Sequence, residues 1–367
     1  MVRRSTVLLV CLVSLVFLTF GCATTVSVRH LVPAQIDMSS HRGIAVTSTE
    51  PYLFGFFNRP ASVVKDYTGK SGYRISSGFG AFTEDSVARH VTNTLVSALE
   101  GTDYFHILPP SQTDTIVKGK NLGYSTSDLL VRNSMDALFS TSIEYLGIDE
   151  YIYAVDKKVT LTHDPVTGVQ LPTPVVQIVQ VYYLKQKVTL TFRYEIADVR
   201  TGKIITSRSQ NSEYEQSIDL TQKPKTGYFA PSLEPVINDM LDEIVRPLVK
   251  KIAPRWETTT LSLMSNKPER PSIEYAWEEV RRGNLFIALE AFEEEWQRSR
   301  HIPSGYNAAL VMEAMAQTVE DLQKAIDLMQ KVYQASGNSK IYTTLRTMRQ
   351  RLEDQRLAES QIMGTSW

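Results

Sequence analysis

The pattern of apolar residues changes once along the chain, and this change predicts two parts with different folds. In the first part apolar and polar residues often alternate, as in residues 188–196 (VTLTFRYEI), which is typical of β-strands. From residue 272 onward apolar residues recur at intervals of three and four, which is typical of one face of a helix. The segment between them, residues 265–271 (SNKPERP), is polar and contains two prolines. We therefore expect an α+β domain over residues 22–265 and an all-α domain over residues 272–360.

The α+β part begins with two predicted strands, at residues 26–29 and 43–48, both rich in β-branched residues. Thr83 is a suitable N-cap, and the apolar residues after it recur at helical spacing, which predicts a helix over residues 83–100. Two further elements are expected next: a short strand over residues 104–108 and a helix over residues 125–135.

Two hairpins are expected between residues 137 and 217. The turn sequence DVRTG at residues 198–202 lies between strand patterns at 188–196 and 203–207 and predicts one hairpin. A second hairpin is expected from three segments: residues 151–162, a tip at 164–168, and residues 175–183.

Helices are expected after the hairpins. Residues 233–249 have apolar side chains at intervals of three and four, so they predict an amphipathic helix that covers the sheet. Lys250 and Lys251 lie late in it, as the helix macrodipole favours, and Pro247 predicts a kink because it lacks the backbone N–H. Five helices are expected in the all-α part: residues 272–282, 285–298, 305–316, 319–335 and 339–357.

Charge and cysteine content exclude several classes of function. The chain has 39 Lys and Arg and 40 Asp and Glu residues, with both signs mixed along every segment. A protein that binds nucleic acid normally shows a basic face, so no nucleic-acid partner is expected. The two cysteines, Cys11 and Cys22, both lie near the N-terminus, which leaves no cysteine elsewhere for a disulfide, a metal site or a nucleophile.

The first residues have the order of a secretion signal. Two arginines precede an almost unbroken apolar run over residues 7–20, and Gly21 and Cys22 follow. A membrane-spanning helix needs about 20 apolar residues, so the run is short, and the order resembles a bacterial lipoprotein signal peptide. The resemblance implies a signal peptide over residues 1–21, cleavage between Gly21 and Cys22, and a lipid on the Cys22 thiol; an uncleaved signal anchor is the alternative. The protein would then lie on the periplasmic face of the inner or outer membrane of a cell envelope, with the outer membrane slightly favoured.

The all-α part resembles tetratricopeptide repeats. Four residues occupy the small, turn-glycine, small and aromatic positions of such a repeat: Ala276, Gly283, Ala288 and Phe292. Ala325 lies at the position equivalent to Ala288, after an interval slightly longer than one repeat. The resemblance implies two repeats and a closing helix, which would present a surface for a protein partner. Asn307 and Glu313 are candidate residues of that surface.

The first part resembles the CsgG-like α/β sandwich, named for the curli-secretion channel lipoprotein. The resemblance rests on the order of a strand, a helix containing TLVSALEGTDYFHIL, a hairpin around DVRTGK and a terminal helix. The whole plan, including YNAALVMEA and the late LEDQ, is also similar to an uncharacterised family of bacterial lipoproteins with C-terminal repeats.

An aromatic segment, residues 51–57 (PYLFGFF), is a candidate contact surface, because exposed contiguous apolar side chains often mark an interaction site. Four aromatic residues belong to it: Tyr52, Phe54, Phe56 and Phe57. The alternative is that the segment folds over its own sheet.

Two acidic positions raise the question of burial. Glu313 lies among apolar residues (AALVMEAMA), so it is expected on the polar edge of its helix, or else it needs a partner such as an arginine. The acidic run at residues 293–295 is expected on a solvated face.

Catalysis and metal binding are not indicated. The six histidines form no metal-binding pair on one helix turn, and a G-x-S-x-G motif is absent. Asp149 and Glu150 would point to opposite faces of a strand. Gly78 and Gly80 precede a predicted helix, but no phosphate-loop lysine follows them. We expect no enzyme activity, no catalytic residue, no metal and no small-molecule cofactor.

Three hypotheses for function follow. The first is a membrane-anchored, non-catalytic lipoprotein that binds a protein or supports assembly through its C-terminal repeats. The second is a ring-forming outer-membrane secretion channel component like the curli exporter, although four residues interrupt the alternation of the long hairpin: Lys157, Lys158, Pro172 and Pro174. The third is a hydrolase or ligand receptor.

Overall fold

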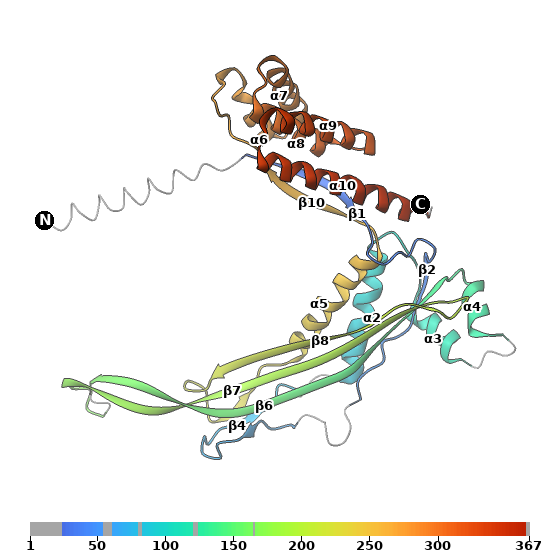
Figure 1. Cartoon of the computed structure of the whole chain (residues 1–367). Coiled ribbons are helices and arrows are strands. Elements are labelled where there is room, and N and C mark those ends of the chain that lie inside the picture. The colour runs from blue at the N-terminus through green and yellow to red at the C-terminus, as the bar shows by residue number, and fades with distance from the viewer. Residues whose placement is uncertain (1–23, 54–60, 80–82, 120–123, 164–165, 365–367) are drawn as a thin grey trace. The chain divides into compact units, whose positions relative to one another are not determined.

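The computed structural model describes residues 24–53, 61–79, 83–119, 124–163 and 166–364, and the chain forms two compact units. Gln35–Ala253 form one, which we call the sheet unit; residues up to Ala34 and Pro254–Trp367 form the other, which we call the helical unit (Figure 1). The division differs from the predicted one, because the segments on either side of the sheet unit join the helical unit. Of these segments only residues 26–29 were predicted as a strand, and the strand at Arg255–Ser262 was not predicted. Alternation of apolar and polar residues carries no information on which core a strand enters.

The sheet unit contains a mixed sheet. Six strands of the described residues form it, in the order β5–β2–β6–β7–β8 with β3 beside β6. Their bounds are β2 (Gly43–Val46), β3 (Lys65–Asp66), β5 (His106–Leu108), β6 (Ala137–His163), β7 (Gln170–Asp198) and β8 (Ile204–Asp219). β2 runs parallel to β5 and β6, whereas β6, β7 and β8 form an antiparallel meander that contains both predicted hairpins. A separate parallel pair consists of β4 (Arg74–Ser76) and β9 (Thr226–Phe229).

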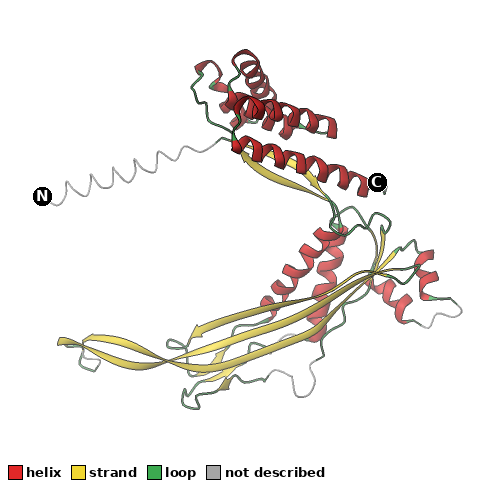
Figure 2. Cartoon of the chain, in the orientation of Figure 1, coloured by secondary structure: helices red, strands yellow, loops and turns green. Residues whose placement is uncertain are grey.

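Two helices, α2 (Glu84–Glu100) and α5 (Glu234–Ile252), pack together on one face of this sheet (Figure 2). Thr83 begins α2 as predicted: its hydroxyl accepts a hydrogen bond from the Ser86 N–H at 3.1 Å, which satisfies a free donor of the first turn. Apolar side chains of both helices and of β6 and β7 form one core. Each large aliphatic side chain buried in this way stabilises the unit by about 1.5–3 kcal/mol.

Two shorter helices complete the sheet unit. α4 (Thr126–Arg132) confirms the second predicted helix. α3 (Pro110–Lys118) was not predicted, although Pro110 at its first position is typical of a helix start.

The helical unit combines a strand pair with helices. β1 (Thr25–Val32) and β10 (Arg255–Ser262) are antiparallel, and Val26 shares a core with the helices. After a 3-10 turn at Pro271–Ile273, five α-helices of the described residues follow: α6 (Tyr275–Arg282), α7 (Leu285–Ser299), α8 (Ile302–Met315), α9 (Val319–Ser336) and α10 (Ser339–Met363). The five predicted helical segments are confirmed. In the described part of the chain, no helix is both long enough and apolar enough to cross a membrane.

Small residues allow the helices of this unit to approach closely. Ala288 and Ala325 are fully buried, and a Cβ on Gly305 would lie 2.6 Å from Val332 and 2.7 Å from Trp296. Gly283 ends α6 with a φ of +83°, a backbone conformation that favours glycine. The residues that the sequence marks as small or as a turn therefore lie where the helices meet or end.

Candidate functional site

The residues predicted to bind lipid, membrane or partner lie in different places. Five of them are outside the described residues: Gly21, Cys22, Phe54, Phe56 and Phe57. Tyr52 is partly buried and packs against the core of the sheet unit, with its ring centre 5.6 Å from that of Tyr145. For Tyr52, this placement agrees with the alternative in which the aromatic segment folds over its own sheet.

Asn307 lies inside the helical unit. Its side chain accepts a hydrogen bond from the Met264 N–H at 2.7 Å and donates one to the Met264 carbonyl at 2.9 Å. The Trp277 indole N–H donates to the same carbonyl at 2.9 Å. Asn307 is fully buried, so it holds the segment after β10 against α8 and does not face a partner, contrary to the prediction.

Glu313 is also internal, and its predicted position on a polar helix edge is wrong. It is 1% exposed, and its two carboxylate oxygens accept hydrogen bonds from Arg351 at 2.6 and 2.7 Å. Arg351 lies on α10 and is itself buried, so the alternative that Glu313 needs an arginine partner is confirmed. A buried carboxylate requires such a partner because burial removes its hydration.

Glu295 requires a similar correction. It was expected on a solvated face with its acidic neighbours, but it is 2% exposed. Its side chain accepts a hydrogen bond from the Ser299 hydroxyl at 2.5 Å and pairs with Arg298. These two interactions hold the pKa of Glu295 below its ordinary value despite burial.

Three buried polar residues of the sheet unit, Ser77, Glu150 and Gln186, form one hydrogen-bond network. Glu150 is buried while Asp149 is exposed, which confirms that they face opposite sides of β6. Glu150 accepts hydrogen bonds from the Gly78 N–H at 3.1 Å and the Gln186 amide at 2.6 Å, and it also bonds the Ser77 hydroxyl. Every partner is another protein group, so this network stabilises the fold around Gly78.

Two histidines form hydrogen bonds with aspartates that are distant in the sequence. The Nε2 atom of His41 lies 2.9 Å from Oδ2 of Asp198, and the Nε2 atom of His90 lies 2.9 Å from Oδ1 of Asp242. Hydrogen bonds from the Thr201 backbone and from His41 hold the pKa of Asp198 well below its usual range. Among the residues with described positions, no group of three or more His, Cys, Asp or Glu side chains is arranged to hold a metal ion.

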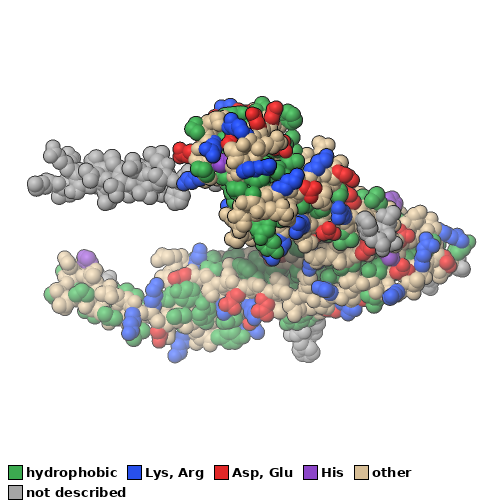
Figure 3. All heavy atoms as spheres, turned by 45° about the horizontal axis from the view of Figure 1, so that its top comes forward, with side chains coloured by type: hydrophobic (Ala, Val, Ile, Leu, Met, Phe, Trp, Pro, Cys, Tyr) green, Lys and Arg blue, Asp and Glu red, His purple; other side chains and the backbone are tan. Residues whose placement is uncertain are grey.

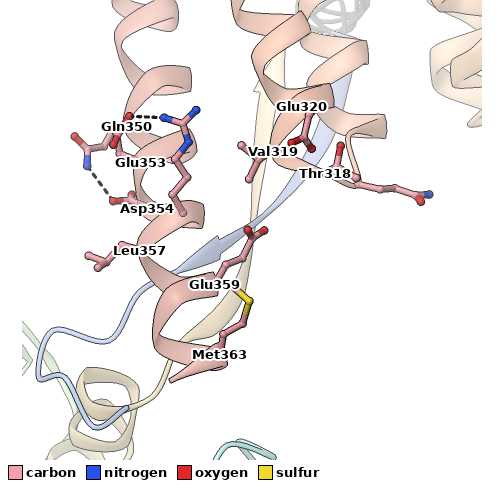
Figure 4. Close-up of a pocket in the computed structure, with 11 residues that line it drawn as sticks. Thr318, Val319, Glu320, Gln350, Glu353, Asp354, Leu357, Glu359 and Met363 are labelled. Atoms are coloured by element: carbon pink, nitrogen blue, oxygen red, sulfur yellow. Dashed lines mark hydrogen bonds and ion pairs between the residues drawn. The ribbon is translucent and has the colours of Figure 1, made fainter. Parts of the chain in front are cut away.

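An open groove of about 1120 Å³ lies in the helical unit, between the start of α9 and the C-terminal half of α10 (Figure 4). Four carboxylate side chains line it: Glu320, Glu353, Asp354 and Glu359. Arg356 also lines it and pairs with Glu353 at 3.3 Å. In Figure 4 the carboxylates of Glu320 and Glu359 both point into the space between the two helices. The groove therefore carries an excess of negative charge.

Apolar side chains lie among these acids. Val319, Leu357 and Met363 line the groove, and Leu357 and Met363 are 46% and 68% exposed. An apolar surface bordered by carboxylates can bind a partner segment that carries both apolar and basic side chains.

Local interactions fix the two walls of the groove. Thr318 caps α9 by accepting a hydrogen bond from the Asp321 N–H at 3.2 Å, which sets the direction of the first turn. The opposite side of α10 is buried, and its Gln361 bonds the N–H and carbonyl of Ala34 at 2.8 and 3.1 Å. α9 and α10 also contact each other and share one core, which holds the two walls together.

The sequence did not identify this groove. Its residues belong to segments far apart in the sequence, and α10 continues beyond the predicted end at residue 357 to Met363. Gly364, which ends the helix with a φ of +70°, was the available signal for the true end.

The chain thus combines an α+β sheet unit with a helical unit that carries an open acidic and apolar groove. No protein-family model and no curated protein matches it. Among solved structures it is similar to the PelC dodecamer from Paraburkholderia phytofirmans, with 11% identity, a TM-score of 0.23, and 60% of this chain and 96% of that chain covered.

Two further solved structures are similar at the same level. Lipoprotein GNA1162 from Neisseria meningitidis has 9% identity and a TM-score of 0.24, with 56% of this chain and 96% of that chain covered. Protein XCC0632 from Xanthomonas campestris has 8% identity and a TM-score of 0.27, with 60% and 85% covered. Scores this low assign neither a fold family nor an activity to this chain.

Proposed function

We propose that the protein is a non-catalytic envelope lipoprotein, held at a membrane by a lipid on Cys22, whose helical unit binds another protein. The observation that supports a binding role is the groove between α9 and α10. Burial of the exposed parts of Leu357 and Met363 by a partner would contribute on the order of 1–2 kcal/mol each. The surrounding carboxylates would select partners that carry positive charge.

The same proposal gives the helical unit two tetratricopeptide-like repeats, α6–α7 and α8–α9, with α10 as the closing helix. The buried positions of Ala288 and Ala325 and the turn at Gly283 support it. A CsgG-like α/β arrangement of the sheet unit is proposed from the order of its elements. The N-terminal signal supports attachment at the periplasmic face of a membrane, with the outer membrane favoured.

Site-specific cross-linking tests the groove. A photoreactive benzoylphenylalanine replaces Leu357 in the full chain, which is then irradiated in intact cells. We expect a cross-linked adduct with a protein, and no adduct when the label replaces Phe286, an apolar residue of α7 that is 69% exposed and outside the groove. The charge reversals Glu320→Lys and Glu359→Lys should remove the adduct, whereas Glu290→Lys, an exposed position on α7, should preserve it.

The two parts of the proposal fail separately. An adduct that forms equally at both label positions, or none at Leu357, would refute the binding role of the groove. In the same cells labelled palmitate should enter the native chain but not the Cys22→Ser variant. Absence of label from the native chain would refute the lipid anchor and leave the result at the groove unaffected.

A further inference from the structure

β6 and β7 extend beyond the rest of the sheet as a two-stranded ribbon (Figure 1). β3 pairs with β6 only at Tyr151 and Ile152, and β8 ends at Asp219, opposite Tyr183. We call residues 153–161 and their partners 175–183 the ribbon. Beyond the pair of Tyr183 with Asp219, neither outer edge of the ribbon has a strand neighbour within the described residues.

The pairing of the two strands is regular through this region. It runs without a bulge from Tyr145 opposite Thr191 to Leu161 opposite Val175, and odd-numbered residues always face odd-numbered residues. Side chains alternate between the two faces of a strand, so one face of the sheet continues as the odd-numbered face of the ribbon. The other continues as the even-numbered face.

The odd-numbered face changes from polar to apolar where the ribbon begins. Within the sheet the even-numbered residues face the core, and Ile152, Leu184 and Val188 are fully buried. The odd-numbered residues there are polar, as Lys185 and Lys187 show. On the ribbon, six β-branched or aliphatic side chains instead lie on the odd-numbered face: Val155, Val159, Leu161, Val175, Val179 and Val181.

The even-numbered face of the ribbon is mixed. It carries four polar and four apolar residues: Asp156, Lys158, Thr160, Gln180, Ala154, Val176, Ile178 and Tyr182. On the odd-numbered face Val155 and Val175 remain 44% and 50% exposed, and on the even-numbered face Val176 and Ile178 are each 62% exposed. Because the apolar face of the ribbon lies on the side opposite to the core of the sheet unit, that core cannot continue over it. An apolar environment from outside the unit is therefore required.

The order of residue types along the odd-numbered face matches a membrane interface. Lysines of the sheet come first, then tyrosines, then valines. The rings of Tyr153 and Tyr183 are stacked with centres 5.6 Å apart, and Tyr151 lies 6.1 Å from Tyr153. Tyrosine is enriched where headgroups meet acyl chains, because its ring is apolar and its hydroxyl is polar. Figure 3 shows hydrophobic and basic side chains along this end of the sheet.

Other features disfavour a second protein strand as the occupant. Pro172 and Pro174 lie near the tip on β7 and cannot donate backbone hydrogen bonds to an added strand. Lys157 interrupts the apolar face, and a charge at such a position opposes strand association. A lysine can instead extend its amine to a lipid phosphate while its methylene groups stay in the apolar layer.

We propose that the ribbon lies flat in the headgroup layer of an anionic lipid bilayer, with its odd-numbered face toward the acyl chains. A flat orientation is required because unpaired strand edges do not occur within the hydrocarbon layer. At about 3.3 Å per residue the ribbon is roughly 30 Å long, so it contacts many headgroups. This contact is independent of the lipid on Cys22 and of the groove.

A fluorescent label on neighbouring residues of the ribbon tests the proposal. Full-length variants carry Cys11→Ser and Cys22→Ser together with either Val179→Cys or Gln180→Cys, and the new cysteine is labelled with the environment-sensitive dye NBD. The probe membranes are vesicles of phosphatidylcholine and phosphatidylglycerol with or without doxyl groups on the acyl chains. We expect the label at 179 to shift to the blue and to be quenched by the doxyl groups. The label at 180 should remain accessible to aqueous iodide.

The pair of positions makes the result decisive. Both are adjacent residues of the same strand, and unchanged far-UV circular dichroism establishes that both variants fold. Equal iodide quenching at 179 and 180 in the presence of vesicles refutes the proposal. The proposal is also refuted if, without vesicles, the label at 179 becomes protected from iodide as the protein concentration rises. In that case a second copy of the chain covers the odd-numbered face. Equal blue shifts with anionic and purely zwitterionic vesicles would refute the role of the lysines.

Discussion

The buried pair of Glu313 and Arg351 provides the sharpest test of the packing of the helical unit. It joins α8 to α10 through two hydrogen bonds of 2.6 and 2.7 Å, and both side chains are almost completely excluded from solvent. Arg351→Met removes the guanidinium and leaves the carboxylate buried without its counterion. Loss of one partner from a buried pair costs about 3–5 kcal/mol. We expect this loss in the free energy of unfolding of the helical unit.

The double variant separates this cost from the value of the pair itself. Glu313→Leu combined with Arg351→Met leaves no unpaired charge, and replacement of a whole buried pair by apolar residues is often neutral or stabilising. We therefore expect the double variant to recover most of the loss. The coupling between the two positions should exceed about 2 kcal/mol.

Tryptophan fluorescence is a suitable assay because the tryptophans within the described residues, at positions 256, 277 and 296, all belong to the helical unit. Urea unfolding followed by this signal reports on that unit rather than on the sheet unit. A cost below about 1 kcal/mol for Arg351→Met, in the range of exposed pairs, would show that the pair is hydrated and would refute the reasoning. Additive effects of the two substitutions would refute it as well.

Two further predictions concern other contacts. Gly305→Ala should destabilise the helical unit by about 1–2 kcal/mol in the same urea assay, since the overpacking cost against Trp296 exceeds the gain in helix propensity; a gain in stability would contradict the close approach. The pKa of Asp198 in the folded protein is below its ordinary value of 3.8. Ionised Asp198 therefore stabilises the fold above pH 3.8, and this stabilisation is lost as the pH falls from 3.8 to the lower pKa of the folded state. Asp198→Asn should therefore reduce the acid-side decline in melting temperature, followed by circular dichroism, and an unchanged decline would contradict the hydrogen bonds from Thr201 and His41.

Local patterns were sufficient to predict most elements of the fold. The five helices after residue 272 are each set by apolar spacing and by nearby start or end signals such as Thr318 and Gly283. The hairpin at residues 198–202 has a recognisable turn sequence. These signals depend on residues within a few positions of one another, so a single sequence contains them completely.

The parts that could not be predicted depend on partners distant in sequence. β1 and β10 pair across more than two hundred residues, and no local pattern shows that they leave the sheet unit. The burial of Glu313 depends on Arg351, a residue of another helix. The groove likewise combines the first turn of α9 with the last turns of α10. In each case the prediction would require knowing which residues, distant in the sequence, lie close together in the fold.

The ribbon shows that the apolar face of a strand pair can be predicted only when the register of the two strands is known. Residues 175–183 (VVQIVQVYY) do not alternate when considered alone, and Lys157 and Lys158 interrupt the facing strand. Each face of a two-stranded ribbon, however, takes half of its side chains from each strand. Once Val155 is opposite Val181 and Leu161 is opposite Val175, six aliphatic residues of the two strands lie on the same face. The amphipathic surface is therefore a property of the pair, and a shift of one residue in register would abolish it.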